Sequence, residues 1–499
     1  MLTKTEPQPT DHLAGKHFDV LIVGAGISGI DAAYHLQQQC PGKSFALLDR
    51  QEAFGGTWRL HKFPGIRSDS DLFTFGYSWK PWRGVPIATA EEILKYLDEA
   101  IEEQGLRGHI HNGLKVESAV WSTDKARWTL TVVDAGSGER WQVSCAFLWM
   151  CQGYYKQTGY VPDYPGADRF KGPLVHPQGW PEDLDYTGKK VVVIGSGATA
   201  ATIIPALAEG ADHVTMLQRS PTYFYARPKV DELAEQLRVL DVPDEWTHEI
   251  MRRKYLHESA LITQRSFEEP DGLKADLLAG ARAYLGEDYD IDTHFTPRYR
   301  PWRQRLALIP DGDLFKAIRA GKASVETDEI ENLTETGIQL KSGKSLEADI
   351  IVSATGFDLS VLGDIAFEID GTPLAFENCW AHRGILFSGV PNLAWVFGYL
   401  RNSWTLRADL VSGFVCRLLN HMDAQGASVV MPGLRAEDED MPELPLISPE
   451  NFNAGYLMRS MHKMPKQGDR QPWIFSQDYT KEKDEIPAAD LEDGTLVYS

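Results

Sequence analysis

The chain has 499 residues, of which 43% are hydrophobic, 10% aromatic and 24% charged. This composition is that of an ordinary globular protein and excludes a disordered, collagen-like or coiled-coil chain, and the length suits about three domains of roughly 150 residues each. The 50 Lys and Arg residues against 71 Asp and Glu residues give a formal net charge of −21. Such a surface repels phosphate backbones and anionic lipids, so we expect no nucleic acid and no membrane surface as partner.

Targeting and metal-binding signals are absent from the sequence. No run of about 18 apolar residues is present, so no membrane span is expected. The polar stretch 1–15 lacks the apolar core of a signal peptide. The five cysteines are scattered, form no C-x-x-C pair and make no Cys/His cluster with metal spacing. These observations favour a cytoplasmic protein without a metal site.

The first functional motif is a glycine-rich turn after an apolar strand. Residues 18–23 (FDVLIV) predict a buried parallel strand, residues 24–29 (GAGISG) a turn, residues 30–39 a helix and residues 45–48 a second strand. Glycines in this turn let the backbone approach a pyrophosphate, and the helix start supplies amide donors. The acid that ends the second strand is placed to accept a hydrogen bond from a ribose hydroxyl. The predicted cofactor contacts are Gly24, Gly26, Ser28, Gly29 and Asp49.

The same pattern recurs in the middle of the chain. Residues 190–194 (KVVVI) predict a strand, residues 195–200 (GSGATA) a turn, residues 202–209 a helix and residues 213–217 the next strand. That strand ends in Gln-Arg-Ser rather than in an acid, which suits the 2′-phosphate of NADP better than the free hydroxyl of NAD. A solvated surface arginine is the alternative interpretation. The predicted contacts are Gly195, Ser196, Gly197, Ala198, Thr199, Ala200, Ala201, Thr202, Arg219 and Ser220.

Two such units in one chain are typical of a flavoprotein that takes a hydride from a nicotinamide. We therefore predict an α/β fold with two Rossmann-like dinucleotide-binding domains, the first for FAD and the second for NADP. The predicted limits are 16–155 with 363–499 for the discontinuous FAD domain, and 170–227 with 301–359 for the NADP domain. Residues 230–294 are rich in charge and helix formers, which predicts a helical insertion over the substrate cleft.

Three longer motifs carry a family resemblance. Residues 170–181 (FKGPLVHPQGWP) fit F-x-G-x-x-x-H-x-x-x-W-P, residues 55–69 fit G-G-x-W-x-x-x-x-F-P-G-x-x-x-D, and residues 348–357 contain the A-T-G-F strand end. The chain thereby resembles the type I Baeyer–Villiger monooxygenases over residues 18–473, with most similarity to the subgroup that contains the mycobacterial ethionamide-activating monooxygenase. Plain flavin-containing monooxygenases usually lack the Trp-Pro ending, so Trp180 and Pro181 favour the Baeyer–Villiger group.

The resemblance implies a specific activity. NADPH would reduce FAD, dioxygen would give a C4a-peroxyflavin, and its attack on a small ketone would yield an ester or lactone, with sulfoxidation of thioethers beside it. Arg305 aligns with the family's catalytic arginine and Asp69 with the carboxylate that orients it. Many relatives carry Lys where this chain has Gln304, so the preference for NADPH over NADH depends more on Arg219. In the family the segment around His176 couples the two nucleotide domains.

The resemblance also implies further contacts around the flavin. The aromatic residues Trp404, Tyr399 and Tyr77 are interpreted as core, since buried aromatics are more often packing residues, and a place on the wall of a substrate pocket is the alternative. The implied contacts are Gly56, Thr57, Trp58, Arg59, Leu60, Arg67, Ser68, Asp69 and Val116.

Three other functions stay open at this stage. The first is an N- or S-hydroxylating flavin-containing monooxygenase on similar domains. The second is an NADPH or disulfide reductase, against which the missing C-x-x-C pair counts. The third is a non-catalytic flavin-binding module, which the two intact glycine motifs and Arg305 make a poor explanation.

Overall fold

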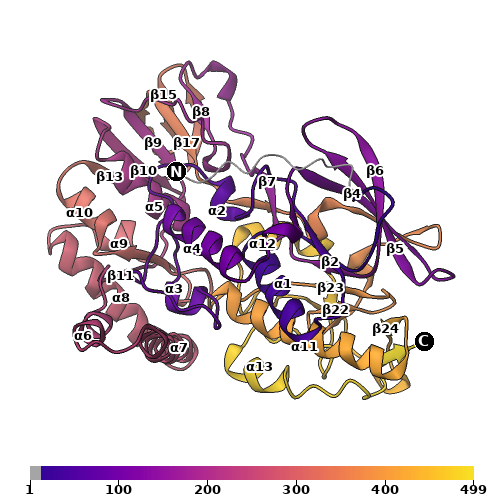
Figure 1. Ribbon diagram of the computed structural model, residues 1–499. Helices are drawn as coiled ribbons and strands as arrows, with labels where there is room; N and C mark the ends of the chain where they lie inside the picture. The colour runs from indigo at the N-terminus through magenta and orange to yellow at the C-terminus, as the bar shows by residue number, and fades with distance from the viewer. Residues whose placement is uncertain (1–12) are drawn as a thin grey trace.

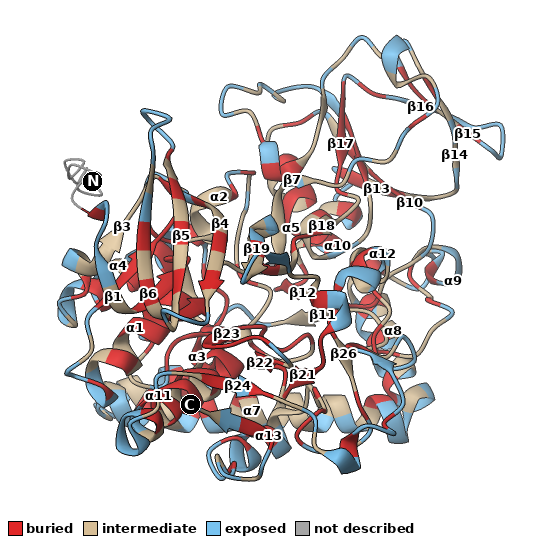
Figure 2. Cartoon of the chain, turned by 90° about the vertical axis from the view of Figure 1, so that its right-hand side faces the viewer, coloured by how far each residue is buried: buried red, intermediate tan, exposed pale blue. Residues whose placement is uncertain are grey.

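The computed structural model describes residues 13–499, so most of the polar stretch 1–15 lies outside the described residues. The chain is built around two separate β-sheets, each covered by helices (Figure 1). Buried residues follow the strands and the helices that pack on them, and exposed residues follow the outer loops (Figure 2). Among the described residues, no helix is both long enough and apolar enough to cross a membrane.

The first sheet has the order β20-β19-β4-β5-β6-β1-β2-β3, and β23 also pairs with β6. Strand β1 runs parallel to both neighbours, β2 and β6, whereas β4, β5 and β6 form an antiparallel meander. The strands are β1 (His17–Val23), β2 (Phe45–Leu48), β3 (Ile110–His111), β4 (Leu114–Ser122), β5 (Arg127–Asp134), β6 (Arg140–Met150), β19 (Ala366–Ile369), β20 (Thr372–Pro373) and β23 (Leu393–Trp395).

The alternation of side chains along β1 explains the apolar run at its carboxyl end. Val20 and Ile22 pack into the core on one face of the sheet, and Leu21 and Val23 pack into the core on the other. This part of the strand is covered on both faces and has no solvent side, so its four buried residues, Val20 to Val23, are all apolar.

The second sheet is parallel throughout, in the order β13-β10-β9-β17-β8. Successive residues of β9 again divide between two cores, which explains the run of valines that predicts this strand. An antiparallel β-sheet of β14, β15 and β16 follows β13 in the chain. The elements are β8 (Leu174–Val175), β9 (Lys190–Ile194), β10 (His213–Gln218), β13 (Ala323–Thr327), β14 (Ile330–Thr334), β15 (Gly337–Leu340), β16 (Ser345–Glu347), β17 (Ile350–Ser353) and α10 (Asp313–Arg319).

The two glycine turns lead into helices that begin earlier than predicted. Helix α1 spans Ile27–Gln39 rather than 30–39, and α5 spans Ala198–Leu207 rather than 202–209. Each begins directly after a glycine in extended conformation, Gly26 or Gly197, so the turn itself supplies the first helical residues. The amide groups that start each helix therefore belong to the turn.

Two short strands connect the nucleotide domains. β7 (Tyr155–Gly159) leaves the first sheet and β18 (Phe357–Leu359) returns to it, and the two pair antiparallel. The predicted helical insertion is helical: it contains α6 (Glu232–Val239), α7 (Asp244–Glu268), α8 (Pro270–Leu285) and α9 (Ile291–His294). The parallel pair β11 (Phe224–Arg227) and β12 (Ala307–Pro310) flanks it. The exact domain limits stay a prediction.

The C-terminal part returns to the first domain. Helix α11 (Trp404–Gln425) packs beside α1, and β27 (Leu496–Tyr498) pairs with β24 (Val430–Pro432), which lies close to the chain end in Figure 1. The remaining helices and strands are α2 (Thr57–Leu60), α3 (Leu72–Phe75), α4 (Ala90–Glu103), α12 (Gly455–Ser460), α13 (Tyr479–Glu485), β21 (Ala381–His382), β22 (Leu386–Phe387), β25 (Leu444–Pro445) and β26 (Lys466–Gln467).

Candidate active site

The first glycine turn lies at the carboxyl end of β1, pressed against the end of β6. Gly24 has φ +108°, and a Cβ there would lie 2.6 Å from the carbonyl oxygen of Cys151. A Cβ on Gly29 would lie 1.8 Å from the carbonyl oxygen of Gly24, so helix and strand pack closely only because both residues are glycine. No described side chain caps the start of α1, which leaves its first amides to a ligand.

Asp49, which follows β2, stabilises this turn by hydrogen bonds. Its carboxylate accepts hydrogen bonds from the backbone N–H of Ala25 at 2.7 Å and of Gln51 at 2.8 Å. Burial raises the pKa of Asp49, and these two hydrogen bonds oppose the rise. The predicted ribose acceptor therefore also fixes the shape of the glycine turn.

The second glycine turn has the same construction at the end of β9. Gly195 has φ +128°, and a Cβ there would lie 2.3 Å from the carbonyl oxygen of Ala354 at the end of β17. The hydroxyls of Ser196 and Thr222 lie 2.8 Å apart and tie the turn to the segment after β10. As with α1, no described side chain caps the start of α5.

One cavity of about 640 Å³ joins the two turns, a volume within the range of small-molecule sites. It contacts the carboxyl ends of both sheets, where open α/β folds bind their ligands. The predicted site residues on its wall are Gly24, Gly26, Ser28, Asp49, Gly56, Thr57, Trp58, Leu60, Ser68, Asp69, Val116, Gly195, Ser196, Gly197, Ala198, Thr199, Arg219, Ser220 and Arg305.

Six predicted residues do not lie on this wall. Ala200, Ala201 and Thr202 are buried, and the two alanines pack into the core of the second domain, because only the first turn of α5 faces the cavity. Gly29 packs beneath Gly24. The helical period turns these four residues away from the cavity, and their direct contact with a cofactor stays a prediction.

The two remaining exceptions are arginines. Arg59 donates to the carbonyl oxygen of Phe54 at 3.3 Å and lies over its ring, on the outer side of α2. Arg67 forms an ion pair with Asp313 at the start of α10, and thereby links the two nucleotide domains. Neither side chain is on the cavity wall, and the contacts that they make are packing and bridging contacts. Their contact with a cofactor stays a prediction.

Arg305 and Asp69 meet on the cavity wall. Nε and Nη2 of Arg305 donate to the two carboxylate oxygens of Asp69, Nη2 also donates to Ser70 Oγ at 3.2 Å, and Nη1 donates to the carbonyl oxygen of Leu400 at 3.0 Å. Burial opposes the charged guanidinium, but Asp69 outweighs it and raises the pKa of Arg305. The site thus holds a permanently charged, oriented cation.

Three tyrosines that the sequence analysis missed lie next to this cation. The hydroxyls of Tyr154 and Tyr155 are 2.7 Å apart, and the rings of Tyr155 and Tyr456 are 5.8 Å apart. All three lie on the cavity wall, and burial raises the pKa of each. They are therefore neutral hydrogen-bonding groups. Tyr154 and Tyr155 are neighbours in the chain, but Tyr456 is far from them in sequence and the three share no motif, so no sequence signal identifies the group.

Two aromatic residues interpreted as core also lie on the wall. Trp404 donates from Nε1 to Ser28 Oγ at 2.8 Å and stacks on Tyr154, so α11 contacts the glycine turn directly. Tyr399 faces the cavity close to Leu400. Tyr77 is 1% exposed and is a core residue as predicted.

His176, the histidine of the motif at residues 170–181, contacts the connecting segments rather than Arg305. His176 Nε2 lies 3.0 Å from the carbonyl oxygen of Gly356, and its Nδ1 accepts from the backbone N–H of Gln178. Burial lowers the pKa of His176. A Cβ on Gly159 would lie 1.9 Å from the ring, so β7 packs directly against it.

A further histidine, His61, lies on the cavity wall. Burial and the neighbouring His176 lower its pKa to about 4, so its imidazole is neutral. Its Nδ1 and the side-chain amide of Gln152, another wall residue, are buried without a hydrogen-bond partner in the described structure. Such groups are normally satisfied by a polar partner.

Asp31, His35 and Asp409 could in principle ligate a metal, since their donor atoms lie within 4.8 Å of one another. These groups already have partners. His35 Nε2 lies 2.7 Å from Asp409, and Asp31 accepts from Trp79 and Ser412. The cluster joins α1 to α11 by hydrogen bonds that need no ion.

Comparison with protein families and with known proteins is consistent with this site. Residues 22–85 match the NAD(P)-binding Rossmann-like domain, and residues 86–236 match the flavin-binding monooxygenase-like family. The chain is 48% identical to the FAD-containing monooxygenase EthA of Mycolicibacterium smegmatis, over 93% of each chain.

Solved structures share the fold. A steroid monooxygenase bound to NADP aligns with a TM-score of 0.74 and 23% identity, covering 97% of this chain and 99% of the other. Cyclohexanone monooxygenase aligns with a TM-score of 0.71 and 20% identity, covering 85% of this chain and 91% of the other. Both support a fold with two dinucleotide-binding domains.

Proposed function

Because this chain belongs to the flavin-binding monooxygenase-like family, among its FAD-containing monooxygenases, we propose that it is an FAD- and NADPH-dependent Baeyer–Villiger monooxygenase. It inserts one oxygen atom beside the carbonyl of a small ketone, giving an ester or lactone, and it also oxidises thioethers. The observation that carries the proposal is the Arg305–Asp69 pair on the wall of the cavity that joins the two glycine turns.

The residues present fit both cofactors. The helix starts at Gly26 and Gly197 lack side-chain caps and lie on the cavity wall, as pyrophosphate groups require. Gly26 and Gly56 approach so closely that a Cβ on Gly56 would lie 3.0 Å from the Cα of Gly26, which leaves bare backbone for a phosphate. Bound FAD, reduced by NADPH, supplies the activation of dioxygen.

Arg305 provides a fixed positive charge for the oxygen-transfer step. A guanidinium has five N–H groups, and among the described residues the four hydrogen bonds to Asp69, Ser70 and Leu400 leave one N–H on Nη1. A preorganised donor of this kind stabilises negative charge that develops on an oxygen atom during the reaction. Asp69 keeps the guanidinium in place and so acts through it.

The tyrosines and Trp404 favour an apolar substrate. Tyr154, Tyr155 and Tyr456 line the cavity together with Arg305, and Trp404 stacks on Tyr154. Such a wall accepts an apolar ketone, excludes water from the reacting atoms, and offers neutral hydroxyls to a carbonyl oxygen. Charged substrates are disfavoured because Arg305 is already paired with Asp69.

An aerobic NADPH assay on the purified FAD-loaded protein tests this proposal. Linear, cyclic and aryl ketones and a set of thioethers serve as substrates, products are identified by mass spectrometry, and hydrogen peroxide is measured in parallel. Arg305→Ala abolishes ester formation. Arg303→Ala is the matched control, because this neighbouring arginine is not on the cavity wall.

The outcomes separate the candidate functions. Ester formation that depends on Arg305 supports the Baeyer–Villiger activity. Sulfoxides or N-oxides without any ester across the panel would favour the N- or S-hydroxylating monooxygenase. Full activity of Arg305→Ala would remove Arg305 from the mechanism.

A further inference from the structure

The carbonyl of Leu400 is one of the anchors that hold the Arg305 guanidinium. Asp69 and Ser70 engage Nε and both hydrogens of Nη2, and Leu400 engages one hydrogen of Nη1 at 3.0 Å. The remaining N–H is on that same Nη1. Because the guanidinium is planar, a shift of the Leu400 carbonyl would remove one of its four hydrogen bonds and let the whole group pivot about its contact with Asp69.

Leu400 belongs to a short loop, 398–400, that one glutamine clamps. Gln477 accepts from the backbone N–H of Leu400 at 2.8 Å and donates to the carbonyl oxygen of Gly398 at 2.9 Å. Gln477 holds a backbone φ of +55°, which non-glycine residues adopt rarely and only when their surroundings impose it. One side-chain amide thus fixes both ends of the loop.

A buried ion pair holds the middle of the same loop. The hydroxyl of Tyr399 donates to Glu482 Oε2 at 2.6 Å, and Arg407 Nε donates to the same oxygen at 2.9 Å. The side chains of Arg407 and Glu482 are 0% and 5% exposed. Arg407 also donates to the carbonyl oxygen of Phe397, so the chain entering the loop is fixed as well.

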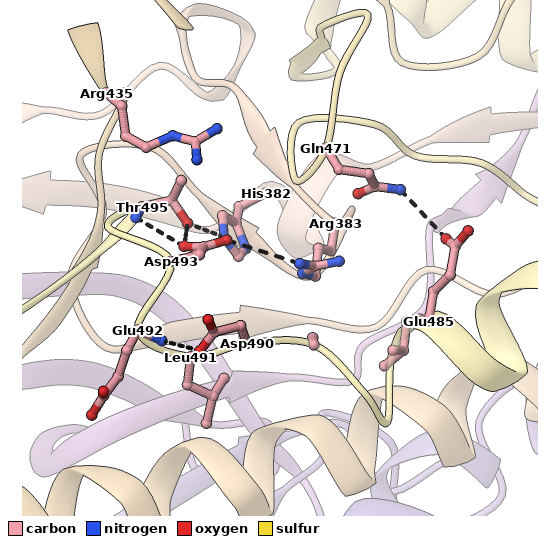
Figure 3. Close-up of polar contacts among 12 residues, drawn as sticks. His382, Arg383, Arg435, Gln471, Glu485, Asp490, Leu491, Glu492, Asp493 and Thr495 are labelled. Atoms are coloured by element: carbon pink, nitrogen blue, oxygen red, sulfur yellow. Dashed lines mark hydrogen bonds and ion pairs between the residues drawn. The ribbon is translucent and has the colours of Figure 1, made fainter. Parts of the chain in front are cut away.

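Gln477 and Glu482 belong to the C-terminal segment 466–499, which is attached at its far end too. Figure 3 shows Asp493 and Thr495 against His382 and Arg383, with His382 Nε2 2.9 Å from Thr495 Oγ1. The carbonyl oxygens of Arg383 and Gly384 in turn accept from Arg407. The segment is therefore tied to the loop before α11 through several independent contacts.

We propose that Gln477 is a positioning residue for Arg305, acting through the backbone of the 398–400 loop. It keeps the Leu400 carbonyl at the one place where it can fix Nη1, and Glu482 supports it through Tyr399. This inference rests on the proposed role of Arg305 in oxygen transfer. It assigns the C-terminal segment a part in that step, although the segment contributes no side chain of its own to Arg305.

The inference has a kinetic signature that simple destabilisation lacks. Partial unfolding lowers NADPH oxidation, product formation and peroxide release in proportion, because it removes active molecules. A misplaced Arg305 leaves NADPH oxidation intact but lowers the oxygenated product, and the difference appears as hydrogen peroxide. The ratio of product to peroxide therefore distinguishes the two effects.

Gln467 offers a matched control in the same segment. It makes the same kind of backbone clamp, accepting from the N–H of Phe475 at 2.9 Å and donating to the carbonyl oxygen of Pro445 at 3.0 Å. It does not lie on the cavity wall and does not contact the 398–400 loop through these bonds. Loss of either clamp should cost a comparable amount of stability.

The experiment compares Gln477→Ala, Gln477→Glu, Gln467→Ala and Arg305→Ala as FAD-loaded full-length proteins. Urea unfolding, the KM for NADPH and the product-to-peroxide ratio are measured for each with the best ketone or thioether of the panel. We expect Gln477→Ala to lower the ratio about tenfold with KM for NADPH within about twofold of wild type. Gln477→Glu keeps the acceptor for Leu400 but loses the donor to Gly398. Its product-to-peroxide ratio should therefore lie between those of wild type and Gln477→Ala.

Each outcome decides one question. An unchanged ratio in Gln477→Ala, or an equal fall in Gln467→Ala, would overturn the inference while leaving the proposed function intact. A wild-type ratio in Arg305→Ala would instead overturn the role of Arg305 on which the inference rests. A fall confined to Gln477 and Arg305 supports both.

Discussion

Arg305 and Asp69 form a two-point ion pair although 236 residues separate them in the sequence. Asp69 ends the motif that follows the first glycine turn, and Arg305 lies just before β12, where the chain returns from the helical insertion. The pair therefore closes only when both nucleotide domains and the insertion are folded together. A charged group assembled in this way is fixed before substrate arrives, which is what electrostatic stabilisation of a reacting oxygen requires.

Replacing Asp69 by Ala should lower product formation roughly tenfold to a hundredfold, because Arg305 stays charged but loses two of its four hydrogen bonds. Asp71→Ala is the control two residues away. Asp71 caps α3 by accepting from Thr74, so its loss should lower the free energy of unfolding by about 1 kcal/mol without changing the product-to-peroxide ratio. Equal ratios in the two variants would show that Asp69 does not act through Arg305.

Gly159→Ala should destabilise the connection between the domains. The new methyl group would lie 1.9 Å from the ring of His176, which two hydrogen bonds hold in place, so β7 or the ring must move. Overpacking of this kind costs about 1–3 kcal/mol. Gly179→Ala is the control, because Gly179 lies in the same motif as His176 and no described atom lies within 4 Å of a Cβ there. Urea unfolding measures both, and an equal stability of the two variants would contradict the packing role of His176.

The glycine turns could be predicted from sequence because their cause is local. An apolar strand, glycines at fixed spacing and a helix determine each turn within about 15 residues, and Asp49 follows from the length of the next strand. It was harder to predict which side chains of a helix face the cavity and which face the core. Ala200, Ala201 and Thr202 follow the second turn without a break, yet the helix turns them into the core.

Residues that only tertiary structure brings together were missed. Tyr155 starts β7 and Tyr456 lies on α12, and nothing in either local sequence indicates that they meet beside Arg305. Arg67 was expected at the flavin because of its motif, but Asp313 of the second domain pairs with it. In each case the partner lies more than 200 residues away in the chain, beyond the reach of any pattern in one sequence.

Arg219→Ala should reduce the preference for NADPH over NADH. Arg219 is exposed on the cavity wall after β10, and Gln304, where the family resemblance implies a lysine, is an uncharged residue of the same wall. Loss of the only arginine expected at the 2′-phosphate should raise the KM for NADPH about tenfold and leave that for NADH unchanged. Arg219→Lys should keep part of the preference. Steady-state kinetics with both cofactors test this, and a parallel rise of both KM values would place the 2′-phosphate elsewhere.

His382 should make the stability of the protein sensitive to acid. Its side chain is 1% exposed, and burial together with Arg383 lowers its pKa to about 3, although Asp493 opposes the shift. In the unfolded chain the pKa of a histidine is about 6.5, so below that pH the unfolded state takes up a proton that the folded state does not. The stability that His382 contributes is thus complete above about pH 6.5 and is lost progressively as the pH falls toward 3.

His382→Gln removes this titration, and the comparison with wild type isolates it from the other acid-sensitive groups. Between about pH 6 and pH 4 the free energy of unfolding of wild type should fall by up to about 1.4 kcal/mol per pH unit more steeply than that of the variant. Urea unfolding followed by tryptophan fluorescence at several pH values measures both slopes. Parallel slopes would mean that His382 gains its proton in the folded state, through an opening of the Thr495 contact shown in Figure 3. If the free energies of unfolding of wild type and variant instead converge as the pH falls, His382 stays neutral in the folded protein and the C-terminal segment stays closed over it.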